Sequence, residues 1–143
     1  MRTNIKTLLF GEFQECDAIG KMLGQTEGFA TDAHEFRHID DIEEFEKILV
    51  TWMPSLVIVL ADGAAGMESV YRSRQRRPSL PVFWFSDDRE FGMQSFRLGC
   101  AYFSTKPVTP EKIKLALRRC DHVGISYTLH KSDGYHKPTP GGK

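Results

Sequence analysis

The chain has 143 residues, with 19 lysines and arginines against 19 aspartates and glutamates. This length suits one domain with its own hydrophobic core, and the balanced charge gives no overall field that would attract nucleic acid or a membrane surface. No apolar stretch approaches the ~18 residues of a membrane-spanning helix, and the sequence shows no signal peptide. We therefore expect a cytoplasmic protein that binds neither nucleic acid nor membrane through this domain.

The charges are unevenly placed along the chain. Eight acids and two bases lie from Glu27 to Lys47, whereas four arginines and no acid lie from Arg72 to Arg77. Runs of this kind are usually the solvated faces of helices. We interpret both runs in this way.

Five short apolar segments alternate with segments of helical periodicity. The expected strands cover residues 5–10, 29–36, 56–61, 82–85 and 101–105. The second of these is the weakest, because polar residues interrupt it as in an edge strand. The third is apolar at every position from Leu56 to Leu60, so both of its faces should be buried, as in the centre of a parallel sheet.

Capping and breaking residues mark the expected helices. The first should end at Gly28, the second should begin at Asp40-Asp41, and the third should run from Met67 to Arg77 after a loop of small residues. The fourth should end at Gly99, and the fifth should begin at Thr109-Pro110. Trp84 and the phenylalanines are assigned to the core.

The alternation of strands and helices predicts a doubly wound α/β fold around a five-stranded parallel sheet. We expect this domain to cover residues 1–120. Residues 121–143 have the composition of a polar C-terminal tail. Neither the tail histidines nor the three cysteines have the spacing of a metal site.

Polar residues follow four of the expected strands. The carboxyl ends of parallel strands share one edge of a sheet, so these side chains should lie near one another: Glu12, Asp62, Ser86 and Lys106. One carboxylate for phosphoryl attack, a second acid for Mg²⁺, a hydroxyl and a lysine would together form a phosphate-handling site. The alternative is that these groups are merely solvated, since strand ends are polar in any α/β protein.

Three stretches of the second half resemble the receiver domain of response regulators: 80–86, 95–103 and 106–111. The phrase Phe96-Arg97-Leu98-Gly99, followed by Lys106-Pro107-Val108, is most like the receivers of LytTR-type transcription regulators. The resemblance implies a flavodoxin-like (CheY-like) fold with strand order 2-1-3-4-5. It also implies a switch in which a histidine kinase phosphorylates an aspartate, with Ser86 and Lys106 as the switch hydroxyl and lysine.

The first half departs from the family pattern. The family has an acid pair after the first strand, where this chain has Gly11-Glu12. Counted from Pro54, the phosphoacceptor position is Leu60, and Asp62 lies two residues later. A receiver binds Mg²⁺ with three carboxylates, whereas this chain offers at most Glu12 and Asp62.

We therefore predict a pseudo-receiver that has no enzymatic activity, needs no cofactor and acts through protein–protein contacts. Its partner would be a histidine kinase, another signalling protein or a second copy, bound through residues 90–120, where Arg97, Tyr102, Lys112 and Arg119 are candidate contacts. One alternative is an atypical working receiver that binds Mg²⁺ and accepts the phosphoryl group on Asp62. Another is a flavodoxin-like binder of small ligands, for which residues 63–66 make a poor phosphate loop.

Overall fold

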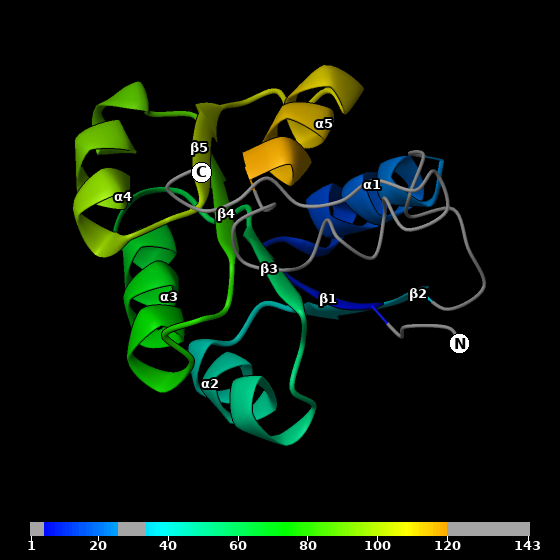
Figure 1. The fold of residues 1–143 in the computed structure, drawn as a ribbon, viewed down its shortest axis with the longest axis vertical. Coiled ribbons are helices and arrows are strands. Elements are labelled where there is room, and N and C mark those ends of the chain that lie inside the picture. The colour runs from blue at the N-terminus through cyan, green and yellow to red at the C-terminus, as the bar shows by residue number, and fades with distance from the viewer. Residues whose placement is uncertain (1–4, 26–33, 120–143) are drawn as a thin grey trace, which may run out of the picture.

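A computed structural model describes residues 5–25 and 34–119 of the chain (Figure 1). The strands are β1 (Ile5–Phe10), β2 (His34–Ile39), β3 (Leu56–Val59), β4 (Val82–Ser86) and β5 (Tyr102–Thr105). The helices are α1 (Phe13–Gly24), α2 (Ile42–Thr51), α3 (Gly63–Arg76), α4 (Gly92–Leu98) and α5 (Pro110–Arg119). A single 3₁₀ turn, η1 (Arg89–Phe91), precedes α4. The expected tail lies outside the described residues.

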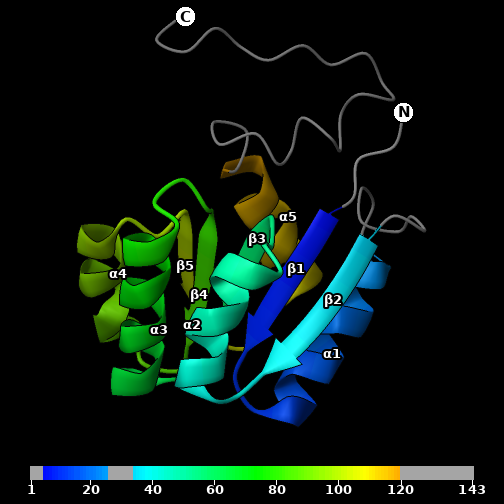
Figure 2. The ribbon, with the colours of Figure 1, turned by 90° about the horizontal axis from the view of Figure 1, so that it is seen from below.

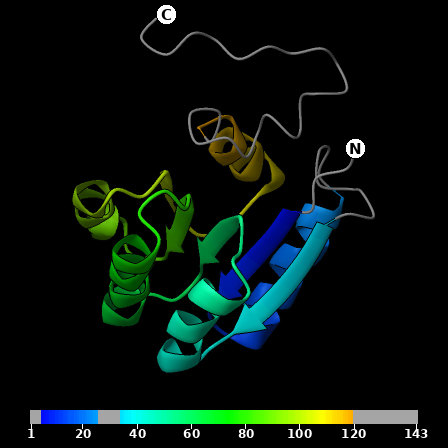
Figure 3. The ribbon, with the colours of Figure 1, turned by 60° about the horizontal axis from the view of Figure 1, so that its bottom comes forward.

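The five strands form one parallel sheet in the order β2-β1-β3-β4-β5, as predicted. The central strand β3 pairs with β1 on one side and β4 on the other, and all four of its residues are buried. Figure 3 shows α3 and α4 side by side near one end of the sheet and β2 at the other.

Helices cover both faces of the sheet (Figure 2). On one face α1 and α5 enclose a core that includes Ile19, Leu60 and Ile113. On the other face α2, α3 and α4 enclose a second core, in which Phe45 and Trp84 are fully buried. Burial of each such side chain stabilises the fold by about 1.5–3 kcal/mol. None of the helices in the described part of the chain is long and apolar enough to cross a membrane.

Three predicted boundaries are wrong. The edge strand β2 continues to Ile39, beyond the predicted end at residue 36, while its predicted start at residue 29 lies outside the described ranges. Helix α1 already ends at Gly24, so the predicted stop at Gly28 lies outside them as well. Residues 63–66 are the first turn of α3, not a loop.

The small residues at the start of α3 allow the helix to approach the sheet. A Cβ atom added to Gly66 would lie 2.6 Å from Trp84 Nε1 and would also clash with the carbonyl oxygen of Ala61. The Trp84 indole donates a hydrogen bond to that same carbonyl at 2.9 Å. The small residues that were expected to form a loop therefore allow close packing of α3 against β3 and β4.

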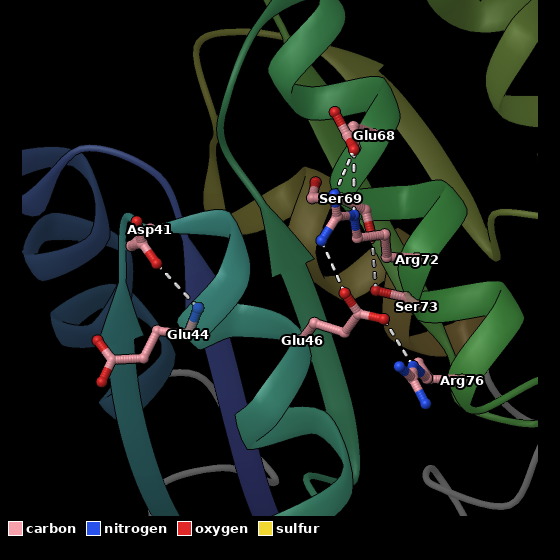
Figure 4. Close-up of polar contacts among 8 residues, drawn as sticks. All are labelled: Asp41, Glu44, Glu46, Glu68, Ser69, Arg72, Ser73 and Arg76. Atoms are coloured by element: carbon pink, nitrogen blue, oxygen red, sulfur yellow. Dashed lines mark hydrogen bonds and ion pairs between the residues drawn. The ribbon is translucent and has the colours of Figure 1, made fainter.

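The predicted ends of the other helices are confirmed. Asp41 caps α2 by accepting a hydrogen bond from the Glu44 N–H at 2.9 Å (Figure 4). Thr109 precedes α5 and accepts one from the Lys112 N–H at 3.2 Å. Gly99 ends α4 in the left-handed conformation, with φ of 84°, which glycine adopts at low cost.

The arginines of α3 lie on the outside of the helix, as predicted, but they also make specific contacts with neighbouring segments. Glu46 of α2 binds both Arg72, at 2.7 Å, and Arg76, at 2.6 Å (Figure 4). Arg74 and Arg77 instead donate to backbone carbonyls that flank the helix or lie in neighbouring segments. These contacts hold α2 against α3.

The assignment of every phenylalanine to the core is also wrong. Phe83 and Phe85 of β4 are fully buried beside Trp84, as predicted. Phe13, at the start of α1, is 57% exposed, and Phe96 of α4 is 81% exposed. These two rings are therefore available to a binding partner.

Candidate functional site

The four predicted site residues lie at the carboxyl edge of the sheet, but they do not form one cluster. Asp62 directly precedes α3, Ser86 is the last residue of β4 and Lys106 directly follows β5. Glu12 lies between β1 and α1 and is exposed. Its carboxylate forms no hydrogen bond or ion pair with another described residue, so it stands apart from the others.

The Lys106 ammonium group is the centre of the site. It donates to Glu15 Oε2 at 2.8 Å, to the carbonyl oxygen of Leu60 at 2.8 Å and to Asp62 Oδ2 at 3.3 Å. An ammonium group has three donors, so these contacts satisfy it completely. Burial alone would lower the pKa of Lys106, but its contacts with Glu15 and Asp62 outweigh burial and raise it. The peptide bond from Lys106 to Pro107 is cis, which the sequence leaves open.

Both oxygens of the Asp62 carboxylate have partners. Oδ1 accepts the Asp87 N–H at 2.9 Å, and Oδ2 faces Lys106. Partial burial would raise the pKa of Asp62, but hydrogen bonds from Asp87 and the nearby Lys106 charge together hold it below its ordinary value. The Asp62 carboxylate is therefore ionised, and each of its oxygens already accepts a hydrogen bond.

Asp87 and Glu15 belong to this site although they were not among the predicted residues. A side-chain hydrogen bond to Asp62, together with the like charge there, raises the pKa of Asp87. Asp87 follows directly after Ser86, so its position could have been suspected from the sequence. Glu15 lies three residues after Glu12, one turn further along α1, and this spacing is the signal that could have identified it.

Ser86 is fully buried and bonded within its own turn. Its hydroxyl oxygen accepts the Asp88 N–H at 3.1 Å, and its carbonyl oxygen accepts the Lys106 N–H at 2.9 Å. The bond with Lys106 joins the ends of β4 and β5. The serine therefore has a clear structural role in the connection between the two strand ends.

Leu60 directs a hydrocarbon side chain into the core at the end of the central strand. The side chain is 1% exposed and packs in the cluster beneath α1 and α5. Gly11 approaches it so closely that an added Cβ would lie 3.0 Å from Leu60 Cβ. The pairing of β3 with β1 is regular from Leu56 to Val59, so the strand shows no shift of register before Leu60.

The donor set does not suit a metal ion. Within residues 5–25 and 34–119, no three histidine, cysteine or acidic side chains are placed to hold one. Mg²⁺ requires near-octahedral oxygen ligands, whereas the Asp62 oxygens already bind an N–H and an ammonium group. Glu12, the other ligand that a working receiver would use here, is not joined to Asp62. These residues therefore do not fit the Mg²⁺ site of the working-receiver alternative.

The two described cysteines are poor nucleophiles. Burial, the larger cause for each thiol, raises the pKa of Cys16 and of Cys100 to about 12. A thiol of this pKa stays protonated at neutral pH, and the thiolate is the reactive form. Cys120 lies outside the described residues.

Comparison with known proteins shows what this chain is similar to. No family model matches the chain. The transcriptional activator protein ExaE of Pseudomonas putida is 38% identical over 71 residues, which are 47% of this chain and 33% of ExaE. The chain thus spans about a third of the length of this curated relative.

Solved structures establish the fold. A CheY-like receiver domain of Methanospirillum hungatei covers 92% of this chain and all of its own, with a TM-score of 0.67 and 14% identity. A receiver domain of Clostridium thermocellum covers 90% of this chain and 97% of its own, with a TM-score of 0.67 and 17% identity. An orphan response regulator of H. pylori covers 90% and 99%, with a TM-score of 0.62 and 18% identity. The chain has the fold of a CheY-like receiver domain.

Proposed function

We propose that this chain is a receiver-like signalling domain of two-component type whose site does not accept phosphate, and that it acts through protein–protein contacts. The observation that carries this proposal is the Lys106 ammonium group, whose three donors are taken by Glu15, Leu60 and Asp62. In a phosphate site, such a lysine supplies the positive charge that binds phosphoryl oxygens. Here the carboxylates of the chain itself neutralise that charge.

The state of Asp62 supports the same conclusion. Phosphoryl transfer depends on positioning the attacking oxygen and on neutralising charge with metal ions. One lone pair of each Asp62 oxygen is already engaged, by the Asp87 N–H or by Lys106, which makes the carboxylate a weaker nucleophile than a free one. Leu60, at the family's phosphoacceptor position, has no group that could attack at all.

The partial similarity to ExaE, whose name describes a transcriptional activator, supports a role in transcriptional control. The resemblance of residues 96–99 and 106–108 to receivers of LytTR-type regulators supports this role too. We assign to this domain the contact with a protein, and we assign any DNA contact to another part of such a system.

The α4–β5–α5 face is the surface that we assign to the partner, and it consists of Met93, Phe96, Arg97, Leu115 and Arg119. All five side chains are exposed, and three of them are large and apolar. Arg119 also lies over the Tyr102 ring, 5.9 Å from its centroid. Aromatic residues, methionine and arginine are enriched in protein interfaces. These side chains are exposed without any phosphorylation of the domain.

A magnesium titration tests this proposal against a working receiver with Asp62 as phosphoacceptor. We expect no saturable change in the amide resonances of Asp62, Asp87 and Lys106 up to millimolar Mg²⁺, because Lys106 occupies the carboxylate. The Asp62→Asn variant is the matched control and should respond like the wild-type protein. Saturable shifts in the wild type that Asp62→Asn abolishes would favour the working receiver.

A further inference from the structure

A hollow lies at the opposite edge of the sheet from Lys106. It has a volume of about 420 Å³ and is bordered by Arg74, Ser79, Pro81, Gly99, Ala101 and Arg119, among other residues. Pro81 precedes β4 and Ala101 precedes β5, so the hollow lies at the amino ends of these strands. Its volume falls within the range of small-molecule sites.

Arg74 is held in place by contacts that leave part of its guanidinium group unused. Nη1 donates to the carbonyl oxygens of Pro78, at 2.5 Å, and Leu80, at 3.4 Å. Nε and Nη2 donate to no other described residue. They lie against Gly99, where an added Cβ would be 3.0 Å from Nε and 3.2 Å from Nη2. The absence of a side chain at Gly99 therefore leaves room beside this edge of the guanidinium.

Arg119 supplies a second positive charge to the same hollow. Its guanidinium lies over the Tyr102 ring, which limits its conformations. Neither Arg74 nor Arg119 forms an ion pair with an acid of the described residues, unlike Arg72 and Arg76 on α3. None of the described residues that border the hollow is acidic. Two arginines thus face one space without a carboxylate of the described residues to neutralise them.

We propose that this hollow binds the phosphate group of a small molecule. Arginine forms paired, charge-assisted hydrogen bonds with phosphate oxygens. Two guanidinium groups and the Ser79 hydroxyl offer more donors than the two oxygens of a carboxylate can use, whereas a phosphate has oxygens for all of them. The apolar walls at Pro81 and Ala101 suit the remainder of a phosphate monoester. The site is separate from Lys106, but Arg119 also belongs to the α4–β5–α5 face assigned to the partner, so a bound phosphate and the partner would share this residue.

The test follows the amide resonances of Ser79, Gly99 and Ala101 during titration with inorganic phosphate and, separately, with glycerol 3-phosphate. Ionic strength is held constant with potassium chloride. We expect saturable shifts with both phosphates, and tighter binding of the monoester if the apolar walls contribute. Binding of inorganic phosphate alone would identify the free ion as the ligand. Shifts that chloride reproduces, or no saturable shift, would overturn the proposal.

Three variants locate the anion. Arg74→Gln and Arg119→Gln should each weaken binding about tenfold or more, the usual effect of losing a hydrogen bond to a charged group. Arg119 is exposed, so Arg119→Gln tests the site even if Arg74→Gln fails to fold. Arg76→Gln is the matched control, on the same helix as Arg74 but paired with Glu46, and it should bind like the wild type. Lost binding in Arg76→Gln, or unchanged binding in Arg119→Gln, would contradict the assignment.

Discussion

Lys106 has an internal carboxylate partner on α1 that its position in the sequence does not reveal. Its side chain is 15% exposed, so the ammonium group depends on Glu15 and Asp62 for charge compensation. A buried charge that loses its partner destabilises the fold. The ion pair with Glu15 joins residues 91 positions apart and ties α1 to the end of β5.

Glu15→Gln should destabilise the protein by about 1 kcal/mol at neutral pH. This value is near the upper end for surface pairs, because Lys106 is largely buried while the Glu15 side chain is 40% exposed and screened by solvent. Urea unfolding at pH 7 measures the effect. Glu12→Gln is the control, since it removes the same charge near the same helix end without removing a described contact. Equal decreases in the free energy of unfolding of the two variants would show that the ion pair between Glu15 and Lys106 contributes nothing to stability.

Asp87→Asn should stabilise the protein at neutral pH. The pKa of Asp87 is raised from 3.8 in the folded state by its hydrogen bond with Asp62 and by the like charge. Folding therefore favours the protonated form of the Asp87 carboxyl group. The stabilisation that this protonated form provides is lost as the pH rises through the pKa of Asp87 in the folded state. An asparagine can still donate a hydrogen bond to Asp62 and carries no charge at any pH.

Thermal unfolding across pH measures this effect. The melting temperature of Asp87→Asn should exceed that of the wild type at pH 7, and the difference should disappear below the ordinary carboxyl pKa. Glu90→Gln is the control, because its exposed carboxylate has no partner among the described residues. A wild type that is more stable than Asp87→Asn at pH 7 would contradict the assigned carboxyl pair.

At the scale of elements, the packing of α3 against the sheet fixes the connection that follows the central strand. Asp62 is followed at once by α3, and Gly66 in the first turn contacts Ala61 and Trp84. This contact sets the position of Asp62 relative to Lys106. The geometry of the candidate site therefore depends on a glycine that carries no functional group.

Gly66→Ala should destabilise the protein by about 1–3 kcal/mol or more, because the added methyl group overlaps the Ala61 carbonyl and the Trp84 indole. Gly24→Ala is the matched control, since nothing lies within 4 Å of a Cβ at that position in α1. Its effect should be small, and a gain of a few tenths of a kcal/mol is expected from the better helix propensity of alanine. Chemical unfolding of both variants measures the difference. Similar stabilities of the two variants would refute the close contact.

The elements themselves were largely predictable from the sequence. The apolar run at Leu56–Leu60 identified the central strand, and the caps at Asp41 and Thr109 located two helices, because these signals are local. The start of α3 was missed because small residues are typical both of loops and of close helix packing. Glu15 and Asp87 lie next to predicted site residues and could have been suspected for that reason, but their partners in distant segments could not be predicted from local patterns.

At the scale of the whole molecule, the exposed aromatic ring of Phe96 is the best probe of the α4–β5–α5 face. Tyr102, a candidate contact from the sequence, is 8% exposed, so its substitution would disturb the core instead. If the partner is a second copy, Phe96→Ser should shift the sedimentation of the protein at micromolar concentration toward the monomer. Phe13→Ser, an exposed ring on α1, should not. A wild type that sediments as a monomer at all concentrations would exclude the homodimer and leave a different protein as the partner.

The central claim is that the receiver fold here has a site that does not accept phosphate. The most direct measurement is the intact mass of the protein after incubation with acetyl phosphate and Mg²⁺. The account predicts an unchanged mass, because Leu60 has no reactive group and the Asp62 oxygens are held by Asp87 and Lys106. A gain of one phosphoryl group that is absent from Asp62→Asn would contradict the account and identify a working receiver.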